Sequence, residues 1–155
     1  MRTKWLSLCL AVSLCLSACG SHPPADLNEV REALVAALSE KGITDVLPLE
    51  ADAVCALYGM EASWVAQAVG LVAMYGAFPD EVILTEAVDT ASAAKIAECL
   101  ELHLNDVLAQ AETYDPESYA AASACTVERD GRYVALILSA SADALRAVYT
   151  EQIRR

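Results

Sequence analysis

Positively charged and aromatic residues are scarce in this chain of 155 residues. It has 10 Lys and Arg against 22 Asp and Glu, which gives a formal net charge of −12. Nucleic acids are bound through clusters of Lys and Arg, so this balance argues against a nucleic-acid-binding protein. It also predicts repulsion from anionic lipid headgroups. Aromatic residues make up only 6% of the chain, so a core has to be built mainly from Leu, Val, Ile and Ala.

The residue patterns of familiar catalytic and metal sites are absent as well. The sequence has no Cys-x-x-Cys, His-x-x-x-His, Gly-x-Ser-x-Gly or glycine-rich phosphate loop. The one histidine of the expected domain, His103, falls in a helical pattern beside Leu100 and Leu104, and we interpret it as a residue at the edge of the core. We therefore predict no catalytic residue, no metal and no cofactor. A pocket joining His103 to a cysteine or to paired carboxylates would favour an enzyme instead.

Acidic residues are numerous, but they do not follow the Asp-x-Asp-x-Asp-Gly spacing of a calcium loop. We interpret the two loose groups of carboxylates as helix caps and as parts of a solvated face. The groups comprise Asp45, Glu50 and Asp52, and Asp80, Glu81, Glu86 and Asp89.

The N-terminal segment is typical of a bacterial lipoprotein precursor. Arg2 and Lys4 precede an apolar run at 5–16, which suits a signal peptide and is short of the roughly 20 residues that span a bilayer. The run ends in a sequence that resembles a lipobox, formed by Leu16, Ser17, Ala18 and Cys19. The small residues suit the lipoprotein signal peptidase, and the cysteine thiol takes up diacylglycerol.

We accordingly divide the chain into a signal peptide at 1–18, a lipidated cysteine and short tether at 19–25, and one globular domain at 26–155. Acyl chains on Cys19 would hold the domain on the extracytoplasmic face of the cell membrane. Pro23 and Pro24 favour an extended tether, whose six residues reach at most about 20 Å. Removal of the two cations of the signal peptide lowers the formal side-chain charge from −12 to −14.

Three further cysteines, Cys55, Cys99 and Cys125, lie within the expected domain. We interpret them as small hydrophobic residues of the core. A Cys99–Cys125 or Cys55–Cys99 disulfide is the alternative in an extracytoplasmic protein, and it would leave one thiol free.

Caps, apolar spacing and turn residues predict several helices. We expect them at 26–41, 50–58, 90–114 and 141–153, with a short helical turn after Pro116. Asp26 is suited to cap the first of these helices and Asp89 or Thr90 the third, and Gly42 and Gly59 are suited to end the first two. The segment 90–114 has the clearest amphipathic pattern.

Strands are expected at 81–88, 124–129 and 132–140, while the Ala- and Val-rich segment 63–74 fits neither period well. Asp130-Gly131 fits a two-residue type I′ turn, which pairs Val127 with Val134 and directs one set of hairpin side chains to the core. The order of elements predicts an α+β fold: a small antiparallel sheet with this C-terminal hairpin, covered on one face by helices that include the long one. The opposite, wetter face would carry Thr126, Glu128 and Tyr133.

Several features occur in a fixed order along the chain. They are the lipobox at Cys19, Tyr58-Gly59-Met60, Glu81-Val82-Ile83-Leu84, Tyr114-Asp115-Pro116-Glu117-Ser118-Tyr119 and the hairpin at 127–139. In this order the chain resembles the small Firmicutes-type lipoproteins grouped as domain of unknown function 4358, although it is richer in alanine. The resemblance implies a strand at 63–74 and an α+β fold, and it supplies no activity, substrate or catalytic residue.

We therefore expect a non-catalytic interaction domain at the membrane surface, which binds an envelope protein. The first candidate surface comprises Tyr114, Tyr119, Thr126, Glu128 and Tyr133. The alternative is a small-ligand-binding lipoprotein associated with a transporter, which an enclosed pocket of several hundred Å³ would favour. An enzyme ranks third.

The lipobox generates a direct test. In cells fed a labelled fatty acid, the Cys19→Ala variant is expected to lose the label, because no other thiol of the N-terminal segment follows small residues in this way. Cys15→Ala, which removes a cysteine from the same segment, should keep it. Labelling that persists in Cys19→Ala would show that another residue carries the lipid.

Overall fold

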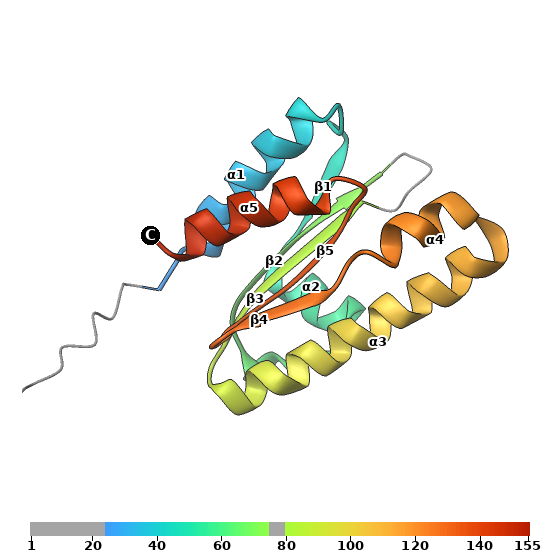
Figure 1. Cartoon of the computed structure of the whole chain (residues 1–155). Coiled ribbons are helices and arrows are strands. Elements are labelled where there is room, and N and C mark those ends of the chain that lie inside the picture. The colour runs from blue at the N-terminus through green and yellow to red at the C-terminus, as the bar shows by residue number, and fades with distance from the viewer. Residues whose placement is uncertain (1–23, 75–79) are drawn as a thin grey trace, which may run out of the picture.

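A five-stranded antiparallel sheet forms the middle layer of the protein. The computed structural model describes residues 24–74 and 80–155. The strands lie in the order β1 (Val46–Leu49), β2 (Val65–Ala73), β3 (Glu81–Ala87), β5 (Tyr133–Leu138) and β4 (Val127–Asp130) (Figure 1). The central strand β3 is buried along its whole length. Pro48 lies in the edge strand β1, where the missing N–H of proline is tolerated.

Two helices, α1 (Leu27–Glu40) and α5 (Ala142–Ile153), cover one face of the sheet (Figure 1). Asp26 is the N-terminal cap of α1, and its side chain accepts a hydrogen bond from the backbone N–H of Asn28. Its apolar residues recur at helical spacing and pack with α5 on one set of strand side chains. The main buried helix residues of this layer are Leu27, Val30, Leu34, Leu38, Leu145 and Tyr149.

The opposite face is covered by the long helix α3 (Thr90–Tyr114), with three short elements beside it. These are α2 (Ala51–Leu57), the 3₁₀ helix η1 (Ala62–Trp64) and α4 (Pro116–Ala122). Asp89 caps α3 through a 2.7 Å hydrogen bond from the backbone N–H of Ser92. The buried stripe of α3 includes Ala93, Ile96, Leu100 and Leu104.

The α+β class, the antiparallel sheet, the hairpin with a two-residue turn and the long helix are confirmed, as is the strand implied at 63–74. Helices cover both faces, not one, because β3 presents apolar side chains to each side and both sides need a partner layer. The face predicted to be wetter lies against α1 and α5, where Glu128 pairs with Arg146 and Tyr133 accepts a hydrogen bond from Ala25. Strand β1 was not predicted.

The hairpin turn differs from the prediction by one residue. Its central residues are Gly131 and Arg132, and Val127 pairs with Leu136 in place of Val134. Gly131 has a φ of 60°, and no described residue other than glycine has a positive φ, so that of Arg132 is negative. A positive φ at the first central residue and a negative φ at the second is the pattern of a type II′ turn. A shift of two residues keeps every side chain on its face, so the predicted core face of the hairpin is confirmed.

The point where the chain enters the domain is fixed to the sheet. The backbone N–H of Ala25 donates to the hydroxyl of Tyr133 at 2.9 Å, and Gln67 donates to the carbonyl of Ala25 at 3.1 Å. Gln67 and Arg132 also donate to the buried carboxylate of Glu86, at 2.7 Å and 2.5 Å. Residues distant in sequence thus hold the N-terminal end against β2, β3 and β5.

No helix in the described ranges is both long and apolar enough to cross a membrane.

The close packing of Gly70 in β2 generates a stability prediction. A Cβ at this position would lie 3.1 Å from both Ile83 Cδ1 and Leu49 Cβ. Gly70→Ala is therefore expected to lower the free energy of unfolding by about 1–3 kcal/mol, measured by urea denaturation. Ala66→Ser, at an exposed position of the same strand, should change it by less than about 0.5 kcal/mol. If Gly70→Ala leaves the free energy of unfolding unchanged, the side chains of Ile83 and Leu49 can move aside without cost.

Candidate functional site

A buried carboxylate in β3 contacts one residue at the end of α2 and one residue of α3. The Glu81 side chain is only 11% exposed. Its Oε2 lies 2.7 Å from Nε2 of His103, and its Oε1 accepts a hydrogen bond from the hydroxyl of Tyr58. The rings of Tyr58 and His103 meet edge to face, with centroids 4.9 Å apart. We call these three residues the Glu81 cluster.

Local sequence features place each member of the Glu81 cluster. Tyr58 is the C-terminal cap of α2, and Gly59 follows it with a φ of 68°. Glu81 is the first residue of β3 and points to the same side as Ile83, towards α2 and α3. His103 lies beside the buried stripe of α3, with its side chain 29% exposed. The sequence predicted this edge position for His103 but not its partners.

The cluster shifts the titration of two of its members. The hydrogen bond with Glu81 raises the pKa of His103, although partial burial acts in the opposite direction. Burial, followed by the hydrogen bond with Glu81, raises the pKa of Tyr58. Tyr58 therefore stays protonated and donates, and the carboxylate fixes the proton of His103 on Nε2. Within the described residues, the hydrogen bond to Glu81 is the one given for the His103 ring, and it is made by Nε2.

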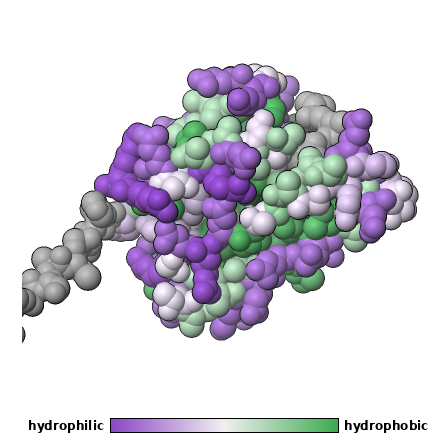
Figure 2. Space-filling model, viewed as in Figure 1, coloured by the Kyte–Doolittle hydropathy of each residue, from purple (hydrophilic) through white to green (hydrophobic). Residues whose placement is uncertain are grey.

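A surface hollow of about 410 Å³ lies between α3 and α4 and includes His103. Its other lining residues come from the last turns of α3 and the start of α4: Val107, Gln110, Ala111, Tyr114, Asp115 and Ser118. Figure 2 shows that the side of the molecule near the N-terminal end is mostly hydrophilic, whereas apolar residues are more frequent towards α3 and α4. The hollow is open to solvent, so it can receive a side chain or a short segment of a partner.

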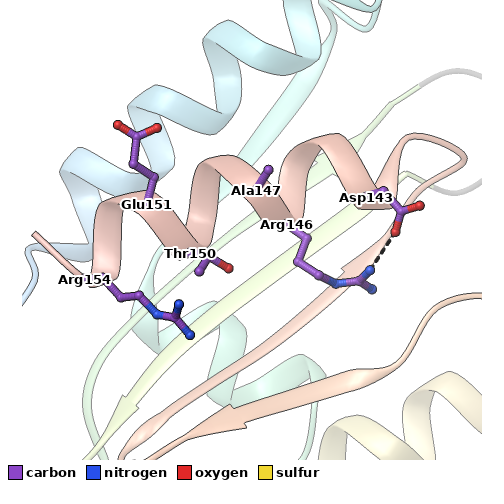
Figure 3. A pocket seen from close by; sticks show the side chains of 6 residues that line it. All are labelled: Asp143, Arg146, Ala147, Thr150, Glu151 and Arg154. Carbon is purple, nitrogen blue, oxygen red and sulfur yellow. Dashed lines mark hydrogen bonds and ion pairs between the residues drawn. The ribbon is translucent and has the colours of Figure 1, made fainter.

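A larger and flatter hollow of about 590 Å³ runs along α5 (Figure 3). All six of its lining residues belong to this one helix, so no second element closes it. Arg146, its central cation, is already paired with Asp143 at 2.7 Å and with Glu128. These features describe the exposed side of a helix, and the α3–α4 hollow is the better candidate site.

The five residues of the predicted interaction surface lie in different parts of the structure. Tyr114 is 85% exposed and lines the α3–α4 hollow, and Tyr119 is exposed on α4. Thr126 is exposed before β4, whereas Glu128 and Tyr133 are engaged with α5 and with the chain entry. The five residues therefore do not form one surface. The lipobox residues Leu16, Ser17, Ala18 and Cys19 lie outside the described residues.

The three cysteines of the domain are free in the structure. Cys125 is buried, and Cys55 and Cys99 are partly buried against the same core cluster. Burial raises the pKa of all three thiols, so they remain protonated and poorly nucleophilic. Among the described residues, no group of three potential ligands could hold a metal ion.

The prediction that the second group of carboxylates lies on a solvated face was wrong for Glu81 and Glu86. Both are buried, and each is paired with residues far away in sequence. Asp89 fits the prediction, because it caps α3. The available signal was the position of both glutamates within a strand that is otherwise apolar apart from Thr85.

A family model described as "Domain of unknown function (DUF4358)" matches residues 39–139. The chain belongs to this family. The matched part of the DUF4358 domain contains every strand and α2, α3 and α4, so it includes the Glu81 cluster and the α3–α4 hollow. Most of α1 and all of α5 lie outside it. Searches of curated proteins and of solved structures found no match.

The Glu81–His103 contact predicts a pH-dependent contribution to stability. Because the folded pKa of His103 is raised, its stabilisation is complete below the unfolded pKa of about 6.5 and is lost as pH rises through the folded value. His103→Gln should therefore lower the free energy of unfolding by about 1–3 kcal/mol near pH 6 and by less at higher pH. Urea denaturation across this range measures the difference.

The matched control for this prediction is His22→Gln, which removes the other histidine of the chain. It should leave the pH profile of stability unchanged. A difference between wild type and His103→Gln that stays constant with pH would contradict a raised pKa for His103.

Proposed function

We propose that this DUF4358 protein is a lipoprotein anchored through Cys19 on the extracytoplasmic face of the cell membrane, and that it binds an envelope protein through the α3–α4 hollow. The sequence from Leu16 to Cys19 supports the anchor, as argued above. The exposed ring of Tyr114 beside the hollow is the single observation that supports the binding surface. A large exposed aromatic residue next to a concave surface is typical of the centre of a protein interface.

The place where the chain enters the domain, at Ala25, supports the choice of the α3–α4 hollow as the binding surface. Ala25 is hydrogen-bonded to the sheet, and α4 with the last turns of α3 lies at the opposite end of the molecule (Figure 1). A lipid at Cys19 would be joined to Ala25 by six residues, so the entry end would stay near the bilayer. The α3–α4 hollow would then face away from the membrane, where a partner protein can reach it.

Binding of a small ligand is the second candidate. The volume of the hollow, about 410 Å³, falls within the range of small-molecule sites. Such sites bury most of the ligand, however, whereas this hollow is open to solvent along α3. The geometry therefore favours a protein partner.

Site-specific photocrosslinking in the native cell tests the proposed interface. A photoreactive amino acid at Gln110, an exposed residue of the hollow, is expected to give a discrete protein adduct in membranes of the producing cells. The same group at Ala147, exposed on α5, should give at least several-fold less of that adduct. Adding Tyr114→Ala should weaken the Gln110 adduct, because it removes the ring without disturbing the core.

Equal adducts at Gln110 and Ala147, or none at either position, would contradict an interface at the hollow. Leu102→Ala provides a second control for Tyr114→Ala. Leu102 is 63% exposed on the same helix and does not line the hollow, so its removal should leave the adduct unchanged.

A further inference from the structure

The α3–α4 hollow combines an apolar wall, an exposed ring and one carboxylate. Val107 and Ala111 contribute apolar surface, Tyr114 contributes its ring, and Asp115 contributes the negative charge. The long stem of an arginine or lysine packs well on apolar surface while its charged end reaches a carboxylate. An aromatic ring nearby adds a cation–π contact. The chemistry of the lining therefore matches a cationic side chain.

The ionised side chains of α3 after Lys95 and of α4 are mostly carboxylates, and one of them, Asp115, lines the hollow. No lysine or arginine occurs between Lys95 and Arg129, a stretch that includes most of α3 and all of α4. Six carboxylates lie on these two helices: Glu98, Glu101, Asp106, Glu112, Asp115 and Glu117. Among the described residues, none of the six takes part in an ion pair. The charge of a protonated His103 is compensated by Glu81, so the surface retains its negative potential.

Asp115 is held in a fixed position by the start of α4. Its Oδ1 accepts hydrogen bonds from the backbone N–H groups of Glu117 and Ser118, and its Oδ2 accepts one from the Ser118 hydroxyl at 2.6 Å. These bonds lower the pKa of Asp115, so the carboxylate stays ionised. A fixed anion requires little reordering when a cation binds.

We propose that the α3–α4 hollow receives an arginine or lysine side chain from a basic segment of the partner protein. This inference rests on the proposed function and specifies the chemistry of its partner. A cation–π contact of this kind occurs within the chain itself, where Nζ of Lys95 lies 4.8 Å from the ring centroid of Trp64. An acidic segment would meet the carboxylate of Asp115 on a helix pair without lysine or arginine after Lys95, and it would be repelled.

The test uses the full lipidated chain in detergent and a short fluorescein-labelled peptide in which arginine alternates with serine. Fluorescence anisotropy is expected to show saturable binding that weakens as salt is added. A peptide with glutamate in place of arginine should not bind. Tyr114→Ala and Asp115→Asn should each weaken binding of the arginine peptide by about threefold, as expected for partly exposed cation–π and ionic contacts.

Matched controls separate the hollow from the general acidity of the chain. Asp89→Asn removes the same charge from another helix cap, at the opposite end of α3, and asparagine caps a helix as well as aspartate does. Leu102→Ala removes an exposed apolar side chain of α3 outside the hollow. Both controls should bind the arginine peptide within about twofold of wild type.

Equal weakening by Asp115→Asn and Asp89→Asn would overturn the proposal, because it would show that net charge alone attracts the peptide. Binding of the glutamate peptide, or no binding of the arginine peptide, would overturn it as well. The crosslinking experiment tests the proposed function separately. If the Gln110 adduct maps to an acidic or neutral segment of the partner, the α3–α4 hollow is an interface but its occupant is not a basic segment. Circular dichroism of each variant confirms that it is folded.

Discussion

The burial of β3 on both faces is the constraint on which the rest of the structure depends. Every residue of β3 is buried, and its side chains alternate between the layer of α2 and α3 and the layer of α1 and α5. Two glutamates lie in this strand and face opposite layers. A buried carboxylate is stable only when it is paired and hydrogen-bonded. The partners are Tyr58 and His103 for Glu81, and Gln67 and Arg132 for Glu86. One glutamate thus organises the candidate site and the other fixes the chain entry.

Elements defined by a few neighbouring residues could be predicted from the sequence. Asp26 and Asp89 accept hydrogen bonds in the first turns of their helices, and Gly59 has the expected positive φ. The position of the hairpin turn was harder to predict, because Gly131 fits both the second central position of a type I′ turn and the first central position of a type II′ turn. The pairing of β4 with β5 decides between them, and β5 is itself held by β3. Local turn preference does not contain this information.

At the candidate site it is clearer still that local sequence patterns do not reveal contacts between distant residues. Tyr58 and His103 lie more than 20 residues from Glu81 on either side, so no local spacing reveals that they meet. What the sequence did contain was a glutamate on the same side of its strand as Ile83, and a histidine beside Leu100 on an amphipathic helix. Both patterns place a polar group towards a core. Since each group would be costly to bury alone, their pairing was the physically consistent outcome.

The fixed chain entry gives the proposed lipid anchor an orienting role. Hydrogen bonds from Ala25 to Tyr133 and from Gln67 to Ala25 attach the start of α1 to the sheet. The hairpin and the end of α5, which lie at the same end of the molecule, carry several of the few cations: Arg129, Arg132, Arg154 and Arg155. The α3–α4 hollow, with Asp115, lies at the opposite end. Under the proposed anchor, a mature chain with a formal side-chain charge of −14 would keep the α3–α4 hollow away from anionic headgroups, and the same arrangement would present the hollow to a partner.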